Sequence, residues 1–179
     1  VDDFDGRLPK TAHQTLDTNE IWIQKLAPYV GGCDEIRCCP SDPQTIKRQQ
    51  NGGSSYLLND FLSVSLVDAF GRTVARSPRI DQLRQPSETH LTFESSDDYG
   101  LSPYSDHTHA RSWINAGWEG LLADIQPDRH RYGSPNGDHT TGRANYLFAD
   151  GHVSSIEAIK VKQWIDKRIN FAKPGENTE

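Results

Sequence analysis

The sequence lacks a long apolar run, an excess of basic residues and any methionine. None of its 179 residues lies in a run approaching the roughly 18 consecutive apolar residues of a membrane-spanning helix. The first ten residues, VDDFDGRLPK, are acidic and polar, which is unlike a secretory signal peptide. With 19 basic and 25 acidic residues the net charge is −6, which argues against a general nucleic-acid binder because such proteins present a basic face.

Several catalytic signatures are also absent. The chain has no H-E-x-x-H zinc motif, no G-x-S-x-G nucleophile elbow and no glycine-rich phosphate-binding loop. No Ser-His-Asp or Cys-His nucleophile pattern is readable either. The sequence therefore indicates no familiar class of hydrolase or nucleotide-binding protein.

What the chain does contain predicts one loop-rich globular domain over residues 1–179. About 150 residues per domain is the usual size. Four tryptophans, six tyrosines and six phenylalanines supply large core side chains, while 14 glycines and 10 prolines favour turns and loops. No internal repeat or linker divides the chain. We expect an α+β fold with a small antiparallel sheet, short docked helices and long loops.

The clearest local pattern is ANYLFADGHVSSI at 144–156, where two β-prone runs flank Asp150-Gly151. Asp-Gly between alternating apolar runs predicts a hairpin with a type I′ turn. The alternation of THLTFESS at 89–96 predicts a half-buried strand, and residues 54–67 predict one strand or two.

Three segments have helical patterns. Asp17 with Glu20 three residues later resembles a capping box and predicts a short helix over the following residues to about position 29. Residues 109–125 form an irregular helical pattern interrupted by Gly117 and Gly120. Residues 157–169 predict an amphipathic helix, whose inward-facing residues are expected to be Ile159, Trp164, Ile165 and Ile169.

The C-terminal segment 170–179, NFAKPGENTE, is expected to be a disordered tail.

The three cysteines, Cys33, Cys38 and Cys39, lie within seven residues. A zinc site commonly uses four ligands in paired C-x₂₋₄-C spacing, which this cluster matches poorly. A local disulfide from Cys33 to Cys38 or Cys39 is one alternative and would imply an oxidising compartment. Reduced structural cysteines, or metal or redox chemistry, are the others.

Histidine and aspartate gather in the second half of the chain. His107 and His109 form an H-x-H pair, which in a strand would place both imidazoles on one face, where an aspartate could complete a zinc or iron site. Solvated loop histidines are the alternative. The candidate metal ligands are Asp97, Asp98, Asp106, His107, His109 and His139, with His130 and His152 nearby in the sequence.

The C-terminal hairpin motif is similar to that of a known family. The segment HTTGRANYLFADGHV resembles the signature of pilin-like proteins with a C-terminal H-X9-DG domain, a planctomycete-type pseudopilin family. Ten residues separate His139 from Asp150, so either the loop is one residue longer than in the family or His139 is not the family's histidine. The matching signature residues are Asn145, Tyr146, Asp150, Gly151 and His152.

Other segments resemble the same family in the same order and cover most of residues 5–156. They are D-G-R-L-P at 5–9, Trp22 with the LAPYV run, R-C-C-P-S-D-P at 37–43, S-Y-x-x-N at 55–59, and P-S-E-T at 86–89 followed by Glu94-Ser95.

The resemblance implies the globular head of a type IV pilin-like or type II secretion pseudopilin-like protein. Such proteins carry an apolar N-terminal membrane helix, which is absent from this chain, so we expect the chain to be a head cut from a longer, membrane-anchored protein. Its implied setting is the periplasmic or extracellular side of the envelope. Its implied function is non-catalytic assembly with other pilin-like or secretion-apparatus subunits.

Calcium is a cofactor that the resemblance also suggests, because related major pseudopilins have a calcium-stabilised loop. Residues 94–106 offer the carboxylates and carbonyls that a hard cation prefers, although no D-x-D-x-D-G loop is present. A polar surface loop is the alternative.

The sequence is also compatible with two other functions. Trp113 and Trp118, with the loop that precedes them, could form a carbohydrate-binding face. A metal-dependent enzyme could use His107, His109, His139 and His152.

Overall fold

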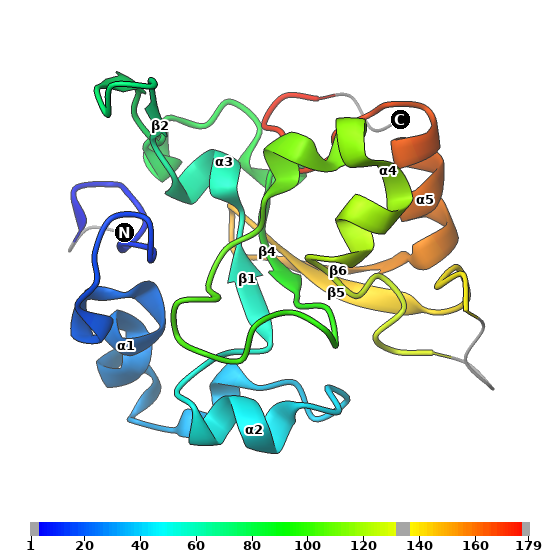
Figure 1. Cartoon of the computed structure of the whole chain (residues 1–179), viewed down its shortest axis with the longest axis horizontal. Coiled ribbons are helices and arrows are strands. Elements are labelled where there is room, and N and C mark those ends of the chain that lie inside the picture. Colours follow the sequence, from blue (N-terminus) through cyan, green and yellow to red (C-terminus); the bar gives the residue numbers. More distant parts are fainter. Residues whose placement is uncertain (1–3, 132–136, 177–179) are drawn as a thin grey trace.

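The main element of the fold is a four-stranded antiparallel sheet with strand order β1-β4-β5-β6. We describe residues 4–131 and 137–176 from a computed structural model. Helices α4 and α5 lie on one side of the sheet, and the N-terminal segment and α1 lie on the other (Figure 1). A two-stranded ribbon, β2-β3, projects from the top of that view. The expected α+β fold with a small antiparallel sheet is confirmed.

The elements are short and separated by long loops. The strands are β1 (Tyr56–Leu58), β2 (Leu66–Val67), β3 (Thr73–Ala75), β4 (His90–Glu94), β5 (Arg143–Phe148) and β6 (Val153–Glu157). The α-helices are α1 (Trp22–Leu26), α2 (Thr45–Gln50), α3 (Asp60–Ser63), α4 (Trp113–Leu122) and α5 (Ala158–Asp166). The 3₁₀ helices include η2 (Thr18–Glu20), η3 (Ala27–Val30), η4 (Asp34–Arg37), η5 (Ile80–Gln82), η6 (Pro86–Glu88) and η7 (Ala110–Ser112).

The C-terminal hairpin forms where it was expected, but its turn differs. Strands β5 and β6 pair from Arg143–Glu157 to Leu147–Val153. The loop is closed by the Gly151 amide donating to Phe148 O and the Phe148 amide donating to His152 O. Gly151 has φ 93°, whereas Asp150 does not have a positive φ. The expected type I′ turn, which needs positive φ at two positions, is therefore wrong, and the loop has three residues with the glycine last.

Gly151 provides a clean test of this turn. Replacing it by alanine should lower the free energy of unfolding by about 1–2 kcal/mol, because an L-residue is strained at this φ. The added Cβ would meet no atom within 4 Å, so crowding contributes nothing. Urea unfolding measures the loss. Gly137→Ala is the matched control, since that glycine has equal space and no positive φ; an equal loss in both variants would contradict this account.

The core lies between the sheet and helices α4 and α5. Along β5, alternate residues Ala144, Tyr146 and Phe148 are buried against these helices, as the two-residue period of a strand requires. Trp113 at the start of α4 is fully buried, and Trp164 of α5 packs in the same cluster. This leaves the opposite face of the sheet available for the N-terminal half of the chain.

The expected disordered tail at 170–179 is wrong at its beginning. Phe171 is 2% exposed, and its ring lies 5.2 Å from that of Trp164 and 5.6 Å from that of Trp113. Asn59 Nδ2 donates to Ala172 O at 2.6 Å, and Asn170 Nδ2 donates to Ala110 O at 2.8 Å. The segment is ordered because it supplies an aromatic side chain and backbone acceptors to the core. Residues 177–179 lie outside the described residues.

The helical predictions are right in place and wrong in detail. The helix expected after Asp17 is divided into η2, α1 and η3, with Asp17 Oδ1 capping the first at Asn19 N. Helix α4 is kinked at Gly117, as expected. On α5, Val161, Trp164 and Ile165 face the core, but Ile159 is 43% exposed rather than inward. Across the described residues, no helix is both long and apolar enough to cross a membrane.

The segment 54–67, for which the sequence predicted one strand or two, contains two strands, β1 and β2. Strand β1 ends at Leu58, and Asn59 then caps α3, because its side chain accepts from Phe61 N at 3.0 Å. The cap turns the chain away from the sheet before β2 begins.

Candidate functional site

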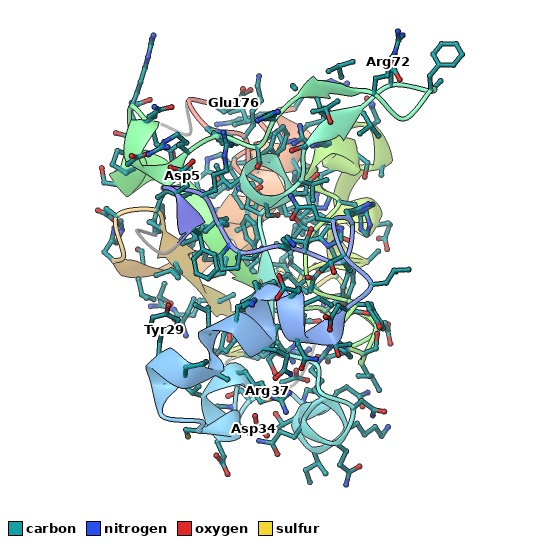
Figure 2. All side chains as sticks on the ribbon, turned by 90° about the vertical axis from the view of Figure 1, so that its left-hand side faces the viewer. Asp5, Tyr29, Asp34, Arg37, Arg72 and Glu176 are labelled. Atoms are coloured by element: carbon teal, nitrogen blue, oxygen red, sulfur yellow. The ribbon has the colours of Figure 1, made fainter. Side chains whose placement is uncertain are left out.

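An apolar groove runs over the face of the sheet that is opposite the core. It has a volume of about 600 Å³. Leu91, Leu147 and Val153 contribute from the sheet, and Pro9 and Leu26 contribute from the N-terminal half. In Figure 2 the N-terminal segment and α1 face the viewer beside the hairpin. The groove is therefore bounded by two parts of the chain that are distant in sequence.

The groove leaves large apolar side chains in contact with water. Val153 on β6 is 62% exposed, Ile36 is 58% exposed and Leu26 is 38% exposed. Arg37 lines one part of the groove, where its guanidinium donates to the backbone oxygens of Gln49 and Gly53. A contiguous apolar depression of this kind is typical of a surface that binds another protein or an apolar ligand.

The five signature residues support the hairpin and its junction with β4. Asn145 N donates to Glu94 Oε2 at 2.8 Å, while Tyr146 is 1% exposed in the core. At the tip, Asp150 Oδ1 lies 2.6 Å from His152 Nδ1, and the His152 ring stacks on Phe148 at 4.2 Å. These contacts explain the motif as a structural element, and no catalytic arrangement is needed to account for it.

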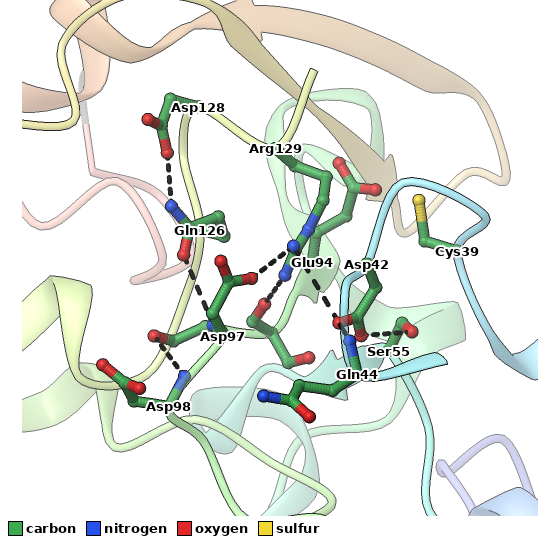
Figure 3. Close-up of polar contacts among 12 residues, drawn as sticks. Cys39, Asp42, Gln44, Ser55, Glu94, Asp97, Asp98, Gln126, Asp128 and Arg129 are labelled. Carbon is green, nitrogen blue, oxygen red and sulfur yellow. Dashed lines mark hydrogen bonds and ion pairs between the residues drawn. The ribbon is translucent and has the colours of Figure 1, made fainter. Parts of the chain in front are cut away.

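The loop that follows the cysteines contributes to a buried network of charged side chains (Figure 3). Asp42 Oδ2 accepts from Ser55 Oγ at 2.6 Å and from Arg48 Nε at 2.7 Å, and Asp42 Oδ1 accepts from Gln44 N at 2.8 Å. Arg129 Nη1 lies 3.9 Å from Asp42. Burial alone would raise the pKa of Asp42, but the hydrogen bonds and the two guanidiniums outweigh it and lower that pKa.

Arg48 is the second centre of this network. It is fully buried, and its two terminal nitrogens donate to Ser96 O and Gly100 O, each at 2.8 Å. Arg129 also donates to Asp97 and to Ser95 O. The network thus joins the loop after Cys39 to the end of β4 and to the loop at Arg129.

The four acidic residues of the segment considered for calcium, Glu94, Asp97, Asp98 and Asp106, do not form a three-ligand group among themselves within the described residues. Asp97 pairs with Arg129, and Asp98 is exposed. Asp106 is fully buried and accepts from Ala12 N at 3.1 Å, and its Oδ1 lies 2.6 Å from His107 Nδ1. Asp97 and Asp106 therefore already have partners within the chain, and calcium binding by this loop stays a prediction.

The candidate histidines separate into different sites. His107 and His109 lie together, with ring centroids 5.4 Å apart, and His13 from the N-terminal segment joins them. His139 Nδ1 instead lies 3.2 Å from Asp128, and His152 belongs to the hairpin tip. Within the part of the chain that the structure describes, neither belongs to a three-ligand group, so the four-histidine enzyme site is not assembled.

A second group of metal-binding side chains brings Cys39 together with Glu94 and His130. Cys39 and Glu94 are buried, and His130 Nε2 lies 3.2 Å from Glu94 Oε1 and 3.0 Å from Asn145 Nδ2. Burial raises the pKa of the Cys39 thiol. His130 and Glu94 are thus already hydrogen-bonded to each other. Because its pKa is raised, the Cys39 thiol is held in its neutral form.

All three cysteines are free thiols, so the local disulfide is not formed. Cys33 is exposed, and its thiol donates to Glu35 Oε2 at 3.3 Å, whereas Cys38 and Cys39 are buried. The 3₁₀ helix η4 lies between the first cysteine and the other two. Cys38 and Cys39 therefore match the alternative of reduced cysteines with a structural role.

The two tryptophans considered for carbohydrate binding are occupied by the protein itself. Trp113 is 0% exposed and its Nε1 donates to Asp124 Oδ2 at 2.8 Å. Trp118 packs against the core, and its Nε1 donates to Asp138 O at 2.9 Å. This leaves no pair of open aromatic faces at that position for a sugar.

Sequence reasoning missed His13, Arg48 and the groove. His13 is 94 residues from His107, and nothing in its local sequence distinguishes it. Arg48 lies in a polar run, KRQQ, that resembles a solvated surface. Comparisons with known protein families, with characterised proteins and with solved structures found no match to this chain.

Proposed function

We propose that this chain is the globular head of a pseudopilin-like subunit that acts through protein–protein assembly and catalyses no reaction. The observation that carries the proposal is the apolar groove on the open face of the sheet. Its occupant would be an apolar segment of another pilin-like or secretion-apparatus subunit. The motif resemblance along residues 5–156 supports the same class of protein.

The chemistry of the groove suits such a partner. Burial of apolar surface contributes roughly 25 cal/mol per Å², so covering the exposed parts of Val153, Ile36 and Leu26 would be favourable. The groove is formed by side chains from the sheet, the N-terminal segment and α1, so its two walls are held by ordered elements. A preformed surface loses little conformational entropy when it binds.

In this proposal the head lies on the periplasmic or extracellular side of the envelope, and an apolar N-terminal helix anchors the full-length protein. The acidic, polar exterior of the head, with its net charge of −6, is compatible with that setting. Neither nucleic acid nor a catalytic cofactor has a place in it.

Val153 gives the sharpest test. The full-length protein, carrying a photo-crosslinking residue next to the groove, is produced in its native cells with Val153 or with Val153→Lys. We expect the first to form crosslinks to a second pilin-like or secretion-apparatus protein, identified by mass spectrometry. We expect the lysine variant to lose most of them, because the charge would be desolvated on assembly.

Val74→Lys is the matched control, because Val74 is also a strand valine, is 64% exposed and does not line the groove. Its crosslinks should match the parent's. Both variants should unfold at nearly the parent's urea midpoint, since exposed substitutions usually change stability by no more than about 0.5 kcal/mol. Equal crosslinking in both variants, or crosslinks to no protein, would refute the assembly role.

A further inference from the structure

Three histidines from two distant segments converge beside the N-terminal segment. His13 lies in the loop before η2, and His107 and His109 lie in the loop before η7. The ring centroids of His13 and His107 are 4.6 Å apart. One ligand nitrogen from each histidine lies within 4.8 Å of the others. That spacing is close enough for a single ion to bind all three after small side-chain movements.

His107 has the hydrogen bonding of a metal ligand. Its Nδ1 lies 2.6 Å from Asp106 Oδ1, and a carboxylate can only accept from this nitrogen, which leaves Nε2 as the nitrogen available to a metal. His107 is 5% exposed, and Nε2 is buried without a hydrogen-bond partner. Metal-binding histidines almost always donate their other ring N–H to a carboxylate or carbonyl in this way.

His109 repeats the arrangement. Its Nδ1 lies 3.2 Å from Asp124 Oδ1, and Asp124 is itself fixed by Trp113 Nε1 and by the amide of His109. Asp124 thus holds the Nδ1 nitrogen of the ring. The second ring nitrogen is therefore left for a different partner.

His13 completes the group from the exposed side. Its ring centroid lies 4.6 Å from that of His107, and one of its nitrogens is within reach of an ion held by the other two histidines. Asp60 is 5% exposed and interacts electrostatically with His13 and with both other histidines. The site thus places the nitrogen donors of three imidazoles next to a buried carboxyl group, Asp60.

We propose that His13, His107 and His109 form a binding site for a divalent transition metal ion, with Zn²⁺ as the expected occupant. Three imidazoles suit zinc, copper or nickel rather than calcium or magnesium, which prefer oxygen donors. A metal supplies the partner that the buried Nε2 of His107 lacks. It also ties the N-terminal segment to the 106–109 loop, where Trp22 Nε1 already donates to Asp106 O at 2.9 Å.

This site goes beyond the proposed function and stands independently of it. It uses none of the residues in the crosslinking test, so either can fail alone. Since Trp22 lines the apolar groove and also bonds to Asp106, metal binding is expected to stiffen one wall of the groove.

Zinc titration of the untagged chain, stripped with a chelator, tests the proposal by calorimetry. We expect one Zn²⁺ per chain. His13→Ala and His109→Ala should each lower the affinity at least about 10-fold, since even changes to outer-shell partners of ligands cost 10- to 100-fold. Both histidines are exposed, so these variants should fold. His152→Ala is the matched control, because His152 is also an exposed histidine held by a carboxylate, and its affinity should be unchanged.

Cobalt substitution separates this site from the group that contains Cys39. We expect visible absorption bands without the charge-transfer bands of a thiolate ligand, and unchanged binding in Cys39→Ser. Three results would overturn the proposal. They are no zinc binding by the folded chain, equal affinity in the parent and in both His13→Ala and His109→Ala, and thiolate bands that vanish in Cys39→Ser.

Discussion

Replacing Asp42 by alanine is expected to lower the free energy of unfolding by about 3–5 kcal/mol, because it leaves a buried arginine without its counter-ion. Asp42 and Arg48 are both fully buried at their side chains and are 2.7 Å apart. The substitution also removes the acceptor for Ser55 Oγ and Gln44 N. For a domain of this size the melting temperature should fall by about 6–20 °C.

The same carboxylate should make the fold sensitive to acid. The pKa of Asp42 is lower in the folded chain than in the unfolded chain, so its contribution is fully present above the ordinary aspartate pKa. That contribution is lost as the pH falls through the lowered pKa of the folded state. In urea unfolding between neutral and acidic pH, the difference between the parent and Asp42→Ala should therefore shrink as the pH falls.

Asp166→Ala is the matched control for this prediction. Replacing Asp166 also removes an ion pair, with Lys162 Nζ at 2.7 Å, but the Asp166 side chain is 56% exposed. Exposed pairs contribute between zero and about 1 kcal/mol, so the change in melting temperature should be small. An Asp42→Ala variant as stable as Asp166→Ala would mean that water reaches the buried network and screens it.

The parts of the fold that the sequence predicts are those with a local cause. The hairpin at 144–156 follows from two alternating runs around a turn glycine, and β4 follows from its own alternation. The kink in α4 follows from Gly117, whose φ of 69° and ψ of −158° are not helical. Each of these features depends on residues within one short segment.

The parts that could not be predicted depend on residues far apart in the chain. Asp42 meets Arg129 across 87 residues, and His13 meets His107 across 94, so no local spacing reveals either pair. The candidate list contained His107 and His109 but paired them with His139, which binds Asp128 instead. The turn type was also missed, because an Asp-Gly pair suits a two-residue and a three-residue loop alike, and only the closing hydrogen bonds and the φ at Asp150 distinguish them.

The C-terminal segment is the clearest case of tertiary structure overriding composition. NFAKPGENTE has few apolar residues, and its composition favours disorder. Phe171 overrides this tendency to disorder, because its position after α5 places its ring in the aromatic core.

Replacing Phe171 by alanine is expected to cost about 3–5 kcal/mol of unfolding free energy, the usual range for a buried phenylalanine. Its ring centroid lies 5.2 Å from that of His90, 6.0 Å from that of Phe93 and 6.3 Å from that of Tyr146, in addition to the two tryptophans. Removing it opens a cavity between β4, β5 and α4 that these rings cannot fill without leaving their own contacts. Thermal and urea unfolding measure the loss.

Phe70→Ala is the matched control, because Phe70 is 83% exposed on the β2-β3 ribbon and its loss should change stability by no more than about 0.5 kcal/mol. Truncation provides a second measurement. A chain ending at residue 169 should lose cooperative unfolding relative to one ending at 176, because it lacks both Phe171 and the Ala172 oxygen that Asn59 binds. A stable, cooperative chain ending at 169 would show that the segment lies on a core complete without it.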